Sequence, residues 1–181
     1  MKETVRMHTH TDKSNKTYRI AALGLLAAMS LGIYALESLL PPLFPIPGLK
    51  PGLSNIITLF ALRRFGKKEA GIVLFVRILL SALLFGNAIS LVYSLLGGAA
   101  ALCIEIIADA ILKGRYLYLT GAFGGLFHNA GQLTTALIIM KTTAVLAYAP
   151  YLAIAGILTG LFTGLCAHYL LSSLRVQEEA A

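Results

Sequence analysis

The apolar residues of this chain form long runs that contain few ionisable side chains. A helix that spans a bilayer needs about 20 predominantly apolar residues. The pattern therefore predicts an all-α membrane protein, a bundle of about six transmembrane helices in which the second is short. The predicted spans are residues 18–40, 53–62, 69–85, 89–112, 117–140 and 146–174.

Three segments outside these runs complete the predicted organisation. Residues 1–17 are polar and predict a disordered cytoplasmic tail, and residues 175–181 a cytoplasmic C-terminal tail, so the transmembrane domain is residues 18–174. Between the first two spans, residues 41–52 hold five prolines and two glycines. This composition predicts a stiff loop without helix.

The basic residues predict the orientation. Cytoplasmic loops of membrane proteins carry an excess of Lys and Arg. With six spans and an inner N-terminus, the outer segments contain only Lys50 and Lys141, and Arg77 lies within a span. The 12 other basic residues of the 15 in the chain are inside: Lys2, Arg6, Lys13, Lys16, Arg19, Arg63, Arg64, Lys67, Lys68, Lys113, Arg115 and Arg175. We therefore expect a multi-pass protein of the cell membrane with both termini cytoplasmic.

Composition agrees with the lipid bilayer as the surroundings. Hydrophobic residues make up 57% of the chain, charged residues only 13%, and the mean hydropathy is +0.79, which is too apolar for a soluble domain. The net charge of +7 is explained by the cytoplasmic flanks, so it does not predict a nucleic-acid partner. Cys103 and Cys166 lie in apolar runs and predict neither a disulfide nor a metal site.

The first span carries small residues at every fourth position, Gly24, Ala28 and Gly32. In lipid, this spacing lets another helix approach closely. Two interpretations follow: the stripe packs inside the bundle, or it is a docking face for a partner membrane protein.

Arg77 is the basic residue placed deep in a span, about 13 Å from the cytoplasmic flank at 1.5 Å per residue. A charge at this depth needs a partner. The simplest partner is Glu105, predicted at a similar depth, and the alternative is an anionic ligand. Asp109 lies nearer the interface and is expected to be solvated or to pair with Lys113 or Arg115.

His128, Asn129 and Gln132 fall near the middle of the fifth span. His128 and Gln132 are four residues apart and share a face of the helix. Such groups are costly in lipid unless they are hydrogen-bonded, so they either bond neighbouring helices or line a solute cavity. We favour the cavity. A single His without a carboxylate beside it does not predict a metal site.

The proline-rich loop is predicted to lie on the outer side, above the short second helix. Ser54 and Asn55 could cap that helix. The functional interpretation makes the loop a lid over an outward-facing pocket, with Lys50 and Asn55 at the entrance.

Catalytic motifs are absent: the sequence has no Asp-rich diphosphate site, no phosphate loop, no HExxH and no GxSxG. We therefore expect no enzyme activity and no bound cofactor. Since there is no nucleotide site, energy for any transport has to come from another protein.

Several short motifs, in order along the chain, resemble the Gx transporter family, whose members are often labelled heptaprenyl diphosphate synthase component I. The similarity extends from Ile20 to about Leu174. Prenyl chain elongation needs carboxylates that hold magnesium and diphosphate, and this sequence supplies no such set. The motifs are PGLKPGLSNI at 47–56, Phe65-Gly66 with a basic pair and Glu69-Ala70, Arg77, Phe85-Gly86, YSLLGG at 93–98, and GLFHNAGQ at 125–132.

The size and helix plan of this family are similar to those of the substrate-binding S components of energy-coupling-factor transporters. This resemblance implies a small membrane subunit that binds a vitamin or related solute, works with a membrane transport subunit and two ATPases, and docks through Gly24, Ala28 and Gly32. The alternative is a membrane scaffold for isoprenoid- or quinone-linked enzymes, without transport. A cavity lined by the fifth helix favours the first hypothesis, and a tightly filled bundle favours the second.

Overall fold

A computed structural model describes the backbone of residues 2–39, 50–85 and 88–180. Within these ranges the chain is helical and contains no strand, which confirms the all-α prediction. The second helix has 10 residues and is short, as predicted. The elements are α1 (Lys2–Ser38), α2 (Asn55–Arg64), α3 (Lys67–Phe85), α4 (Ala88–Ile111), α5 (Leu117–Met140), the 3₁₀ helix η1 (Thr143–Tyr148) and α6 (Ala149–Ala180).

Three segments are long and apolar enough to cross a membrane: Lys16–Ser38, Ala88–Ile111 and Thr143–Leu174. They identify a membrane protein. The helix α2 is too short to span, α3 carries charges, and the polar residues of α5 lower its hydropathy. The number of six spans therefore stays a prediction.

The ends of the chain continue the first and last helices. The helix α1 begins at Lys2, so it includes the segment predicted as a disordered tail, and α6 continues to Ala180. The predicted domain limits at residues 17 and 174 are thus not ends of helices. They stay predictions about where the membrane ends.

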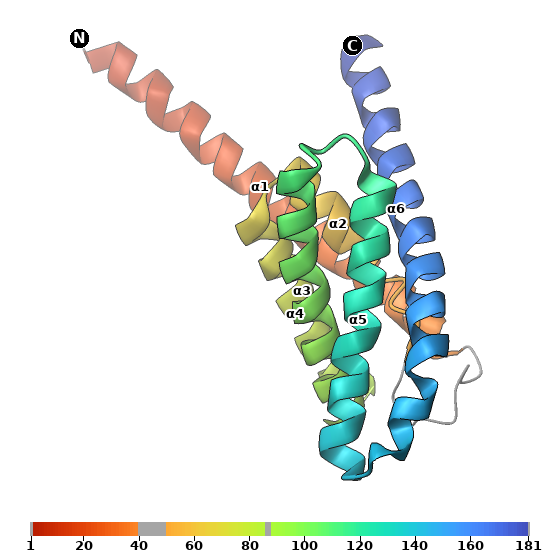
Figure 1. Ribbon diagram of the computed structural model, residues 1–181. Helices are drawn as coiled ribbons and strands as arrows, with labels where there is room; N and C mark the ends of the chain where they lie inside the picture. The colour runs from red at the N-terminus through yellow and green to blue at the C-terminus, as the bar shows by residue number, and fades with distance from the viewer. Residues whose placement is uncertain (1, 40–49, 86–87, 181) are drawn as a thin grey trace.

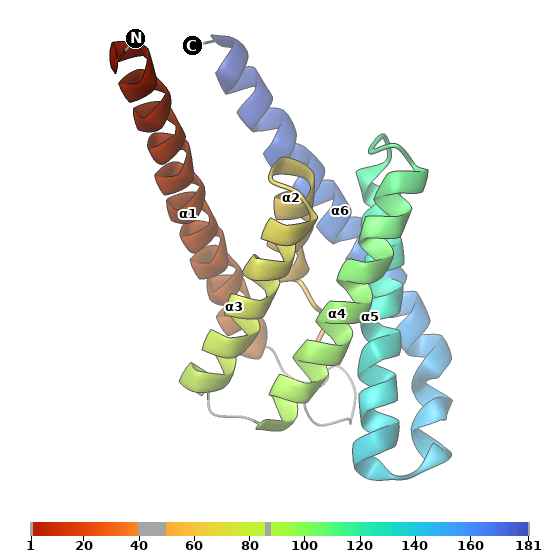
Figure 2. The same cartoon turned by 90° about the vertical axis from the view of Figure 1, so that its left-hand side faces the viewer.

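The helices run up and down in one bundle (Figures 1 and 2). One group contains α4, α5 and α6, and the other contains α1 and α3. The short helix α2 lies between them and contacts α1, α3, α4 and α6. Its apolar side chains, among them Ile57, Leu59 and Ala61, pack with Val73 of α3 and Ala167 of α6 to form the main core.

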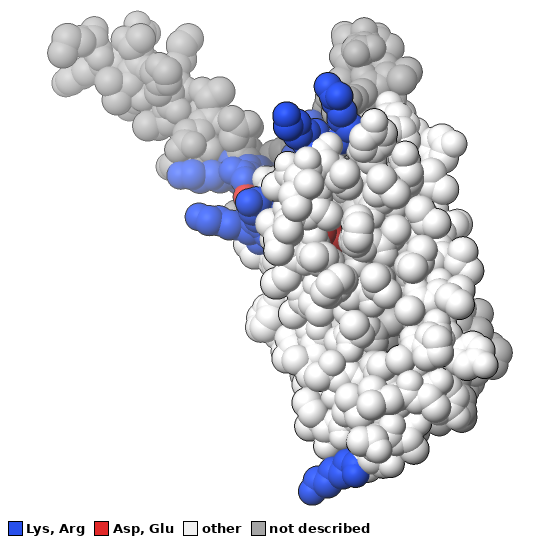
Figure 3. Space-filling view, viewed as in Figure 1, with Lys and Arg blue, Asp and Glu red and all other residues white. Residues whose placement is uncertain are grey.

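Both ends of the chain lie at the same end of the bundle (Figure 1). Figure 3 shows that most of the visible basic side chains gather at this end, which we call the basic end. The basic end includes the α2–α3 and α4–α5 connections, where Arg63, Arg64, Lys67, Lys68, Lys113 and Arg115 lie. This arrangement has the asymmetry expected for cytoplasmic termini, while the side of the membrane stays a prediction.

Glycines bring α5 and α6 into direct backbone contact. A Cβ on Gly121 would lie 2.8 Å from the Cα of Gly164, and a Cβ on Gly125 would lie 2.8 Å from the Cα of Gly160. Gly156 faces Gly125 in the same way. Small residues four apart on both helices permit this approach, in which backbone packing replaces the hydrophobic drive that lipid does not supply.

Candidate functional site

The chain enters the interior of the bundle before α2 begins. Gly52 has a φ of +82°, and a Cβ there would lie 2.8 Å from the Cδ2 and Nε2 atoms of His128. His128 is the twelfth of the 24 residues of α5, so the irregular segment lies at the middle of that helix. Glycine is required here for its conformation and for the close approach.

Glu37, near the end of α1, holds this irregular segment. Its buried Oε1 accepts hydrogen bonds from the backbone N–H groups of Gly52 and Leu53. The carboxylate thereby satisfies two N–H groups that precede α2, where no helical acceptor exists for them.

His128 joins two other predicted site residues in a chain of hydrogen bonds. Its Nδ1 lies 3.3 Å from Nδ2 of Asn55, and its Nε2 lies 3.1 Å from Nε2 of Gln132. The backbone N–H of Lys50 donates to Oε1 of Gln132 at 3.4 Å. The three side chains are at most 5% exposed, so the structure brings together α2, α5 and the irregular segment.

The hydrogens of this chain can be assigned from the bonding pattern. Because Oε1 of Gln132 accepts from Lys50, its Nε2 donates to His128, and the other imidazole nitrogen carries the N–H of a neutral ring. The backbone groups of Gly97 and Lys50 that bond the ring can accept this N–H. Oδ1 of Asn55 has no hydrogen-bond partner.

Arg77 of α3 lies close to this group and is 2% exposed. Its Nη1 donates to Oγ of Ser54, and Glu37 is its main electrostatic partner of opposite charge. The Nε and Nη2 atoms have no hydrogen-bond partner. Ser54 is occupied by Arg77 and makes no side-chain cap on α2, so the prediction that it caps this helix is wrong.

The predicted Arg77–Glu105 pair is also wrong. Nη2 of Arg77 would lie 3.6 Å from a Cβ on Gly98 of α4, whereas Glu105 lies seven residues further along that helix, about 10 Å away. Glu105 instead faces Gly124 of α5, where a Cβ would lie 2.8 Å from its Cδ atom. The prediction compared the depths of Arg77 and Glu105 by counting residues from the ends of their helices. It did not include the shift of α3 along α4.

Asn129 points to another part of the bundle. Its Nδ2 donates to the backbone oxygen of Leu152 in α6 at 2.8 Å, while its Oδ1 has no partner. The predicted α5 cluster is therefore divided, with His128 and Gln132 on the α2 side and Asn129 on the α6 side.

Lys50 contributes its backbone to the site and sends its side chain toward α1. Its Nζ donates to Oγ of Ser38 at 2.6 Å and lies 3.7 Å from the centre of the Tyr34 ring. Tyr34 in turn shares a 2.8 Å hydrogen bond with Ser90. Residues 41–49 of the predicted lid fall outside the described residues.

The small-residue stripe of α1 has open surroundings. Gly24, Ala28 and Gly32 are exposed, and a Cβ on either glycine would meet no atom within 4 Å. Among the described residues nothing packs on this stripe, which removes the interpretation as internal packing.

Sequence analysis did not identify Glu37, and it named Ser54 only as a possible cap. Glu37 is the only acidic residue in the predicted span 18–40. The rule that singled out Arg77, namely that a charge within a span needs a partner, applies to Glu37 equally and would have found it.

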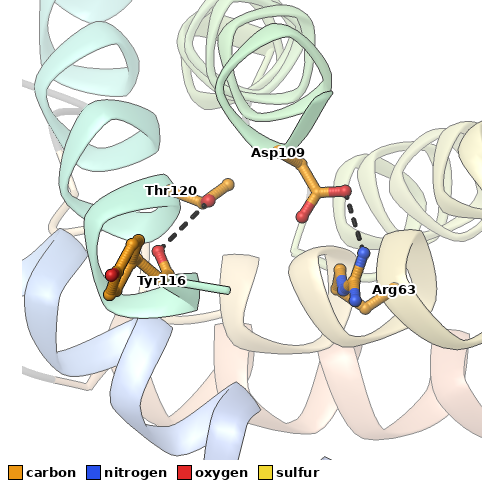
Figure 4. A network of polar contacts seen from close by, with 4 residues as sticks. All are labelled: Arg63, Asp109, Tyr116 and Thr120. Carbon is orange, nitrogen blue, oxygen red and sulfur yellow. Dashed lines mark hydrogen bonds and ion pairs between the residues drawn. The ribbon is translucent and has the colours of Figure 1, made fainter. Parts of the chain in front are cut away.

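At the basic end, Asp109 of α4 pairs with Arg63 of α2, with Oδ2 3.1 Å from Nη1 (Figure 4). The expected alternatives, solvent or a pair with Lys113 or Arg115, are wrong. The pair links α2 and α4, which no pattern in the sequence places side by side.

No curated protein and no solved structure matches the chain. The family model described as heptaprenyl diphosphate synthase component I matches residues 26–170, which is more than half of the 181 residues. The match includes the residues around His128, whereas Gly24 of the α1 stripe lies outside it. The protein therefore belongs to the family of heptaprenyl diphosphate synthase component I, a Gx transporter-like family of membrane proteins.

Proposed function

We propose that this protein is the substrate-binding membrane subunit of an uptake system for a small solute, such as a vitamin, a cofactor or its precursor. The observation that carries the proposal is a group of buried polar atoms without partners: Nε and Nη2 of Arg77 and one amide atom of Asn55. Polar groups inside a membrane protein are costly unless they are hydrogen-bonded. A solute with a hydrogen-bonding edge would satisfy them.

The broken path of the chain supports this proposal. Residues 50–54 are not helical where they pass His128, and α2 begins only after them. At membrane depth, irregular backbone is tolerated where it is buried in protein or lines a cavity, and transporters build solute sites from such discontinuous helices.

The partner in this proposal is a membrane transport subunit that works with two ATPases. The open stripe at Gly24, Ala28 and Gly32 supports it, because these residues leave room for a helix and no described part of the chain fills that room. The protein lies in the cell membrane with the basic end in the cytoplasm.

The proposed subunit is not an enzyme. Its carboxylates within the bundle are separated: Glu37 binds backbone N–H groups, Glu105 faces Gly124, and the partly exposed Asp109 binds Arg63. Magnesium-dependent diphosphate chemistry needs carboxylates that converge on one point. Energy comes from the partner ATPases.

One observation favours a second candidate, a membrane scaffold for isoprenoid- or quinone-linked enzymes. Asn129 donates its amide N–H to a hydrogen bond between α5 and α6, and both ring nitrogens of His128 have hydrogen-bond partners. In a bundle whose polar side chains bond one another in this way, no solute is required to satisfy them.

The test is mass spectrometry of small molecules extracted from the purified protein. We expect one compound to be retained by the wild type and by Lys68→Met, an exposed change on α3 that serves as control, and to be lost from Arg77→Met. Asn129→Leu separates the two roles of the α5 cluster: retention of the compound with reduced thermal stability would make Asn129 a structural bond only. If no compound is retained by any folded variant, the scaffold is favoured.

A further inference from the structure

A pocket of about 290 Å³ lies at the basic end, far from the site around His128. It opens between the end of α2, the α4–α5 connection and the last turns of α6. Its polar lining consists of Arg63, Arg115, His168 and Ser172, and no acidic residue lines it among those whose side chains the structure describes. The proposed function makes no use of this pocket.

The first guanidinium of the pocket is held in place by the fold. Arg63 donates to Oδ2 of Asp109, which is set behind it on α4 (Figure 4). It also packs against Gly114, where any Cβ would collide with the guanidinium group. A guanidinium has five N–H donors, and the bond to Asp109 takes one, so Arg63 has donors left in a fixed orientation.

The turn between α4 and α5 brings the second guanidinium to the same place. Lys113 and Gly114 have φ values of 49° and 68°, and the N–H of Gly114 donates to the backbone oxygen of Asp109 at 3.0 Å. This left-handed turn reverses the chain directly before Arg115. Two arginines from separate elements therefore line one pocket.

We propose that this pocket binds a phosphate group, and that its source is the headgroup of an anionic membrane lipid. Guanidinium groups match phosphate oxygens in geometry and charge, and the imidazole of His168 and the hydroxyl of Ser172 add donors. Basic pockets between helices on the cytoplasmic side of a membrane are suited to anionic headgroups.

The remaining lining distinguishes a lipid from a free phosphate ion. Leu117 and Leu171 form an apolar wall beside the charged groups. On the outer side of α6, Tyr169, Leu170 and Leu174 are exposed at the same level. A lipid would place its phosphate against the arginines and its acyl chains along this apolar surface, whereas a free ion would leave the leucines without a role.

The experiment uses native mass spectrometry of the full chain released from nanodiscs made of equal parts phosphatidylcholine and phosphatidylglycerol. We expect the wild type to retain phosphatidylglycerol in preference to phosphatidylcholine. Arg115→Gln is the main variant, because no hydrogen bond among the described residues depends on this side chain and the protein should fold normally. Loss of one such charge is worth about 1 kcal/mol, so retention should fall about fivefold.

Lys113→Gln is the matched control, since it removes the same charge from the same turn at a residue that does not line the pocket. Equal losses in the two variants would reduce the effect to general surface charge and overturn the proposal. A second arm measures thermal protection by inorganic phosphate in detergent. Protection that requires Arg115, without retained lipid, would keep the phosphate site and overturn its lipid source. If phosphate gives no protection and no lipid is selectively retained, both the phosphate site and its lipid source are overturned.

Discussion

The small residues of α1 and those of α5 and α6 have the same four-residue spacing and opposite surroundings. Gly121, Gly125 and Gly160 bring two helices into backbone contact, whereas Gly24 and Gly32 of α1 face no atom within 4 Å. The spacing therefore indicates that a helix can be approached closely, but it does not indicate which helix approaches it. In α5 and α6 the partner is within the chain, and in α1 we propose that it is another protein.

The largest effect that separates the two stripes is expected on folding. In Gly160→Leu the new side chain meets the backbone of α5, with the Cα of Ala122 only 2.8 Å from its Cβ, so the two helices must move apart. We expect a destabilisation of about 3 kcal/mol or a failure to accumulate folded protein. Gly32→Leu, on the open stripe, should fold normally. Thermal unfolding in detergent compares them, and equal losses would contradict the difference between the stripes.

The second effect concerns the buried polar residues around α2, where Arg77 and Glu37 are electrostatic partners. Arg77→Met should cost about 2 kcal/mol, because it removes the donor to Ser54 and one of the two positive charges that act on the buried Glu37. Adding Glu37→Gln should recover part of this loss. A parallel cycle with Glu105→Gln should be additive within about 0.5 kcal/mol, since Glu105 lies elsewhere on α4. Coupling to Glu105 instead of Glu37 would show that the register of α3 and α4 is different.

A smaller effect is expected at the basic end, where Asp109 of α4 pairs with Arg63 of α2. Asp109→Asn removes the acceptor charge of the partly exposed pair with Arg63, whose side chain is 29% exposed. The loss should be about 1 kcal/mol and should shrink in high salt, because salt screens partly exposed charges. Unfolding measured at low and high salt checks this, and a salt-independent loss would point to a packing role for Asp109.

The smallest effect on stability belongs to the stripe of α1. Ala28→Leu should change the free energy of unfolding by no more than about 0.5 kcal/mol, because the side chain enters open space. It should nevertheless abolish co-purification with a partner membrane subunit, whereas Ala99→Leu, the same change on an exposed position of α4, should not. Equal recovery of the partner with both variants would exclude the stripe as the docking face.

Sequence alone predicted the features that depend on local composition. The lengths of α3, α4 and α5 follow from apolar runs, and the short α2 follows from the prolines before it and Arg63 and Arg64 at its end. The shared face of His128 and Gln132 is confirmed by their 3.1 Å contact, since residues four apart lie over one another.

The relations between helices could not be predicted in the same way. The partner of Arg77 depends on how far α3 is shifted along α4, which no single-helix pattern contains. The direction of Asn129, in contrast, was within reach: a residue next to His128 is rotated by about 100° around the helix, which takes it away from the face shared with Gln132. Its bond to Leu152 of α6 follows from that rotation.

The proposed function depends above all on the unpartnered polar atoms of Arg77 and Asn55, which we assign to a solute site. The most direct measurement is an experimental structure of the protein purified from its native membrane, at a resolution that shows ordered water. If Arg77 and Asn55 form a solute site, we expect a non-protein molecule within hydrogen-bonding distance of Nε and Nη2 of Arg77 and of the Asn55 amide. If ordered waters or atoms of the chain itself satisfy all of these groups, the proposed solute site is contradicted.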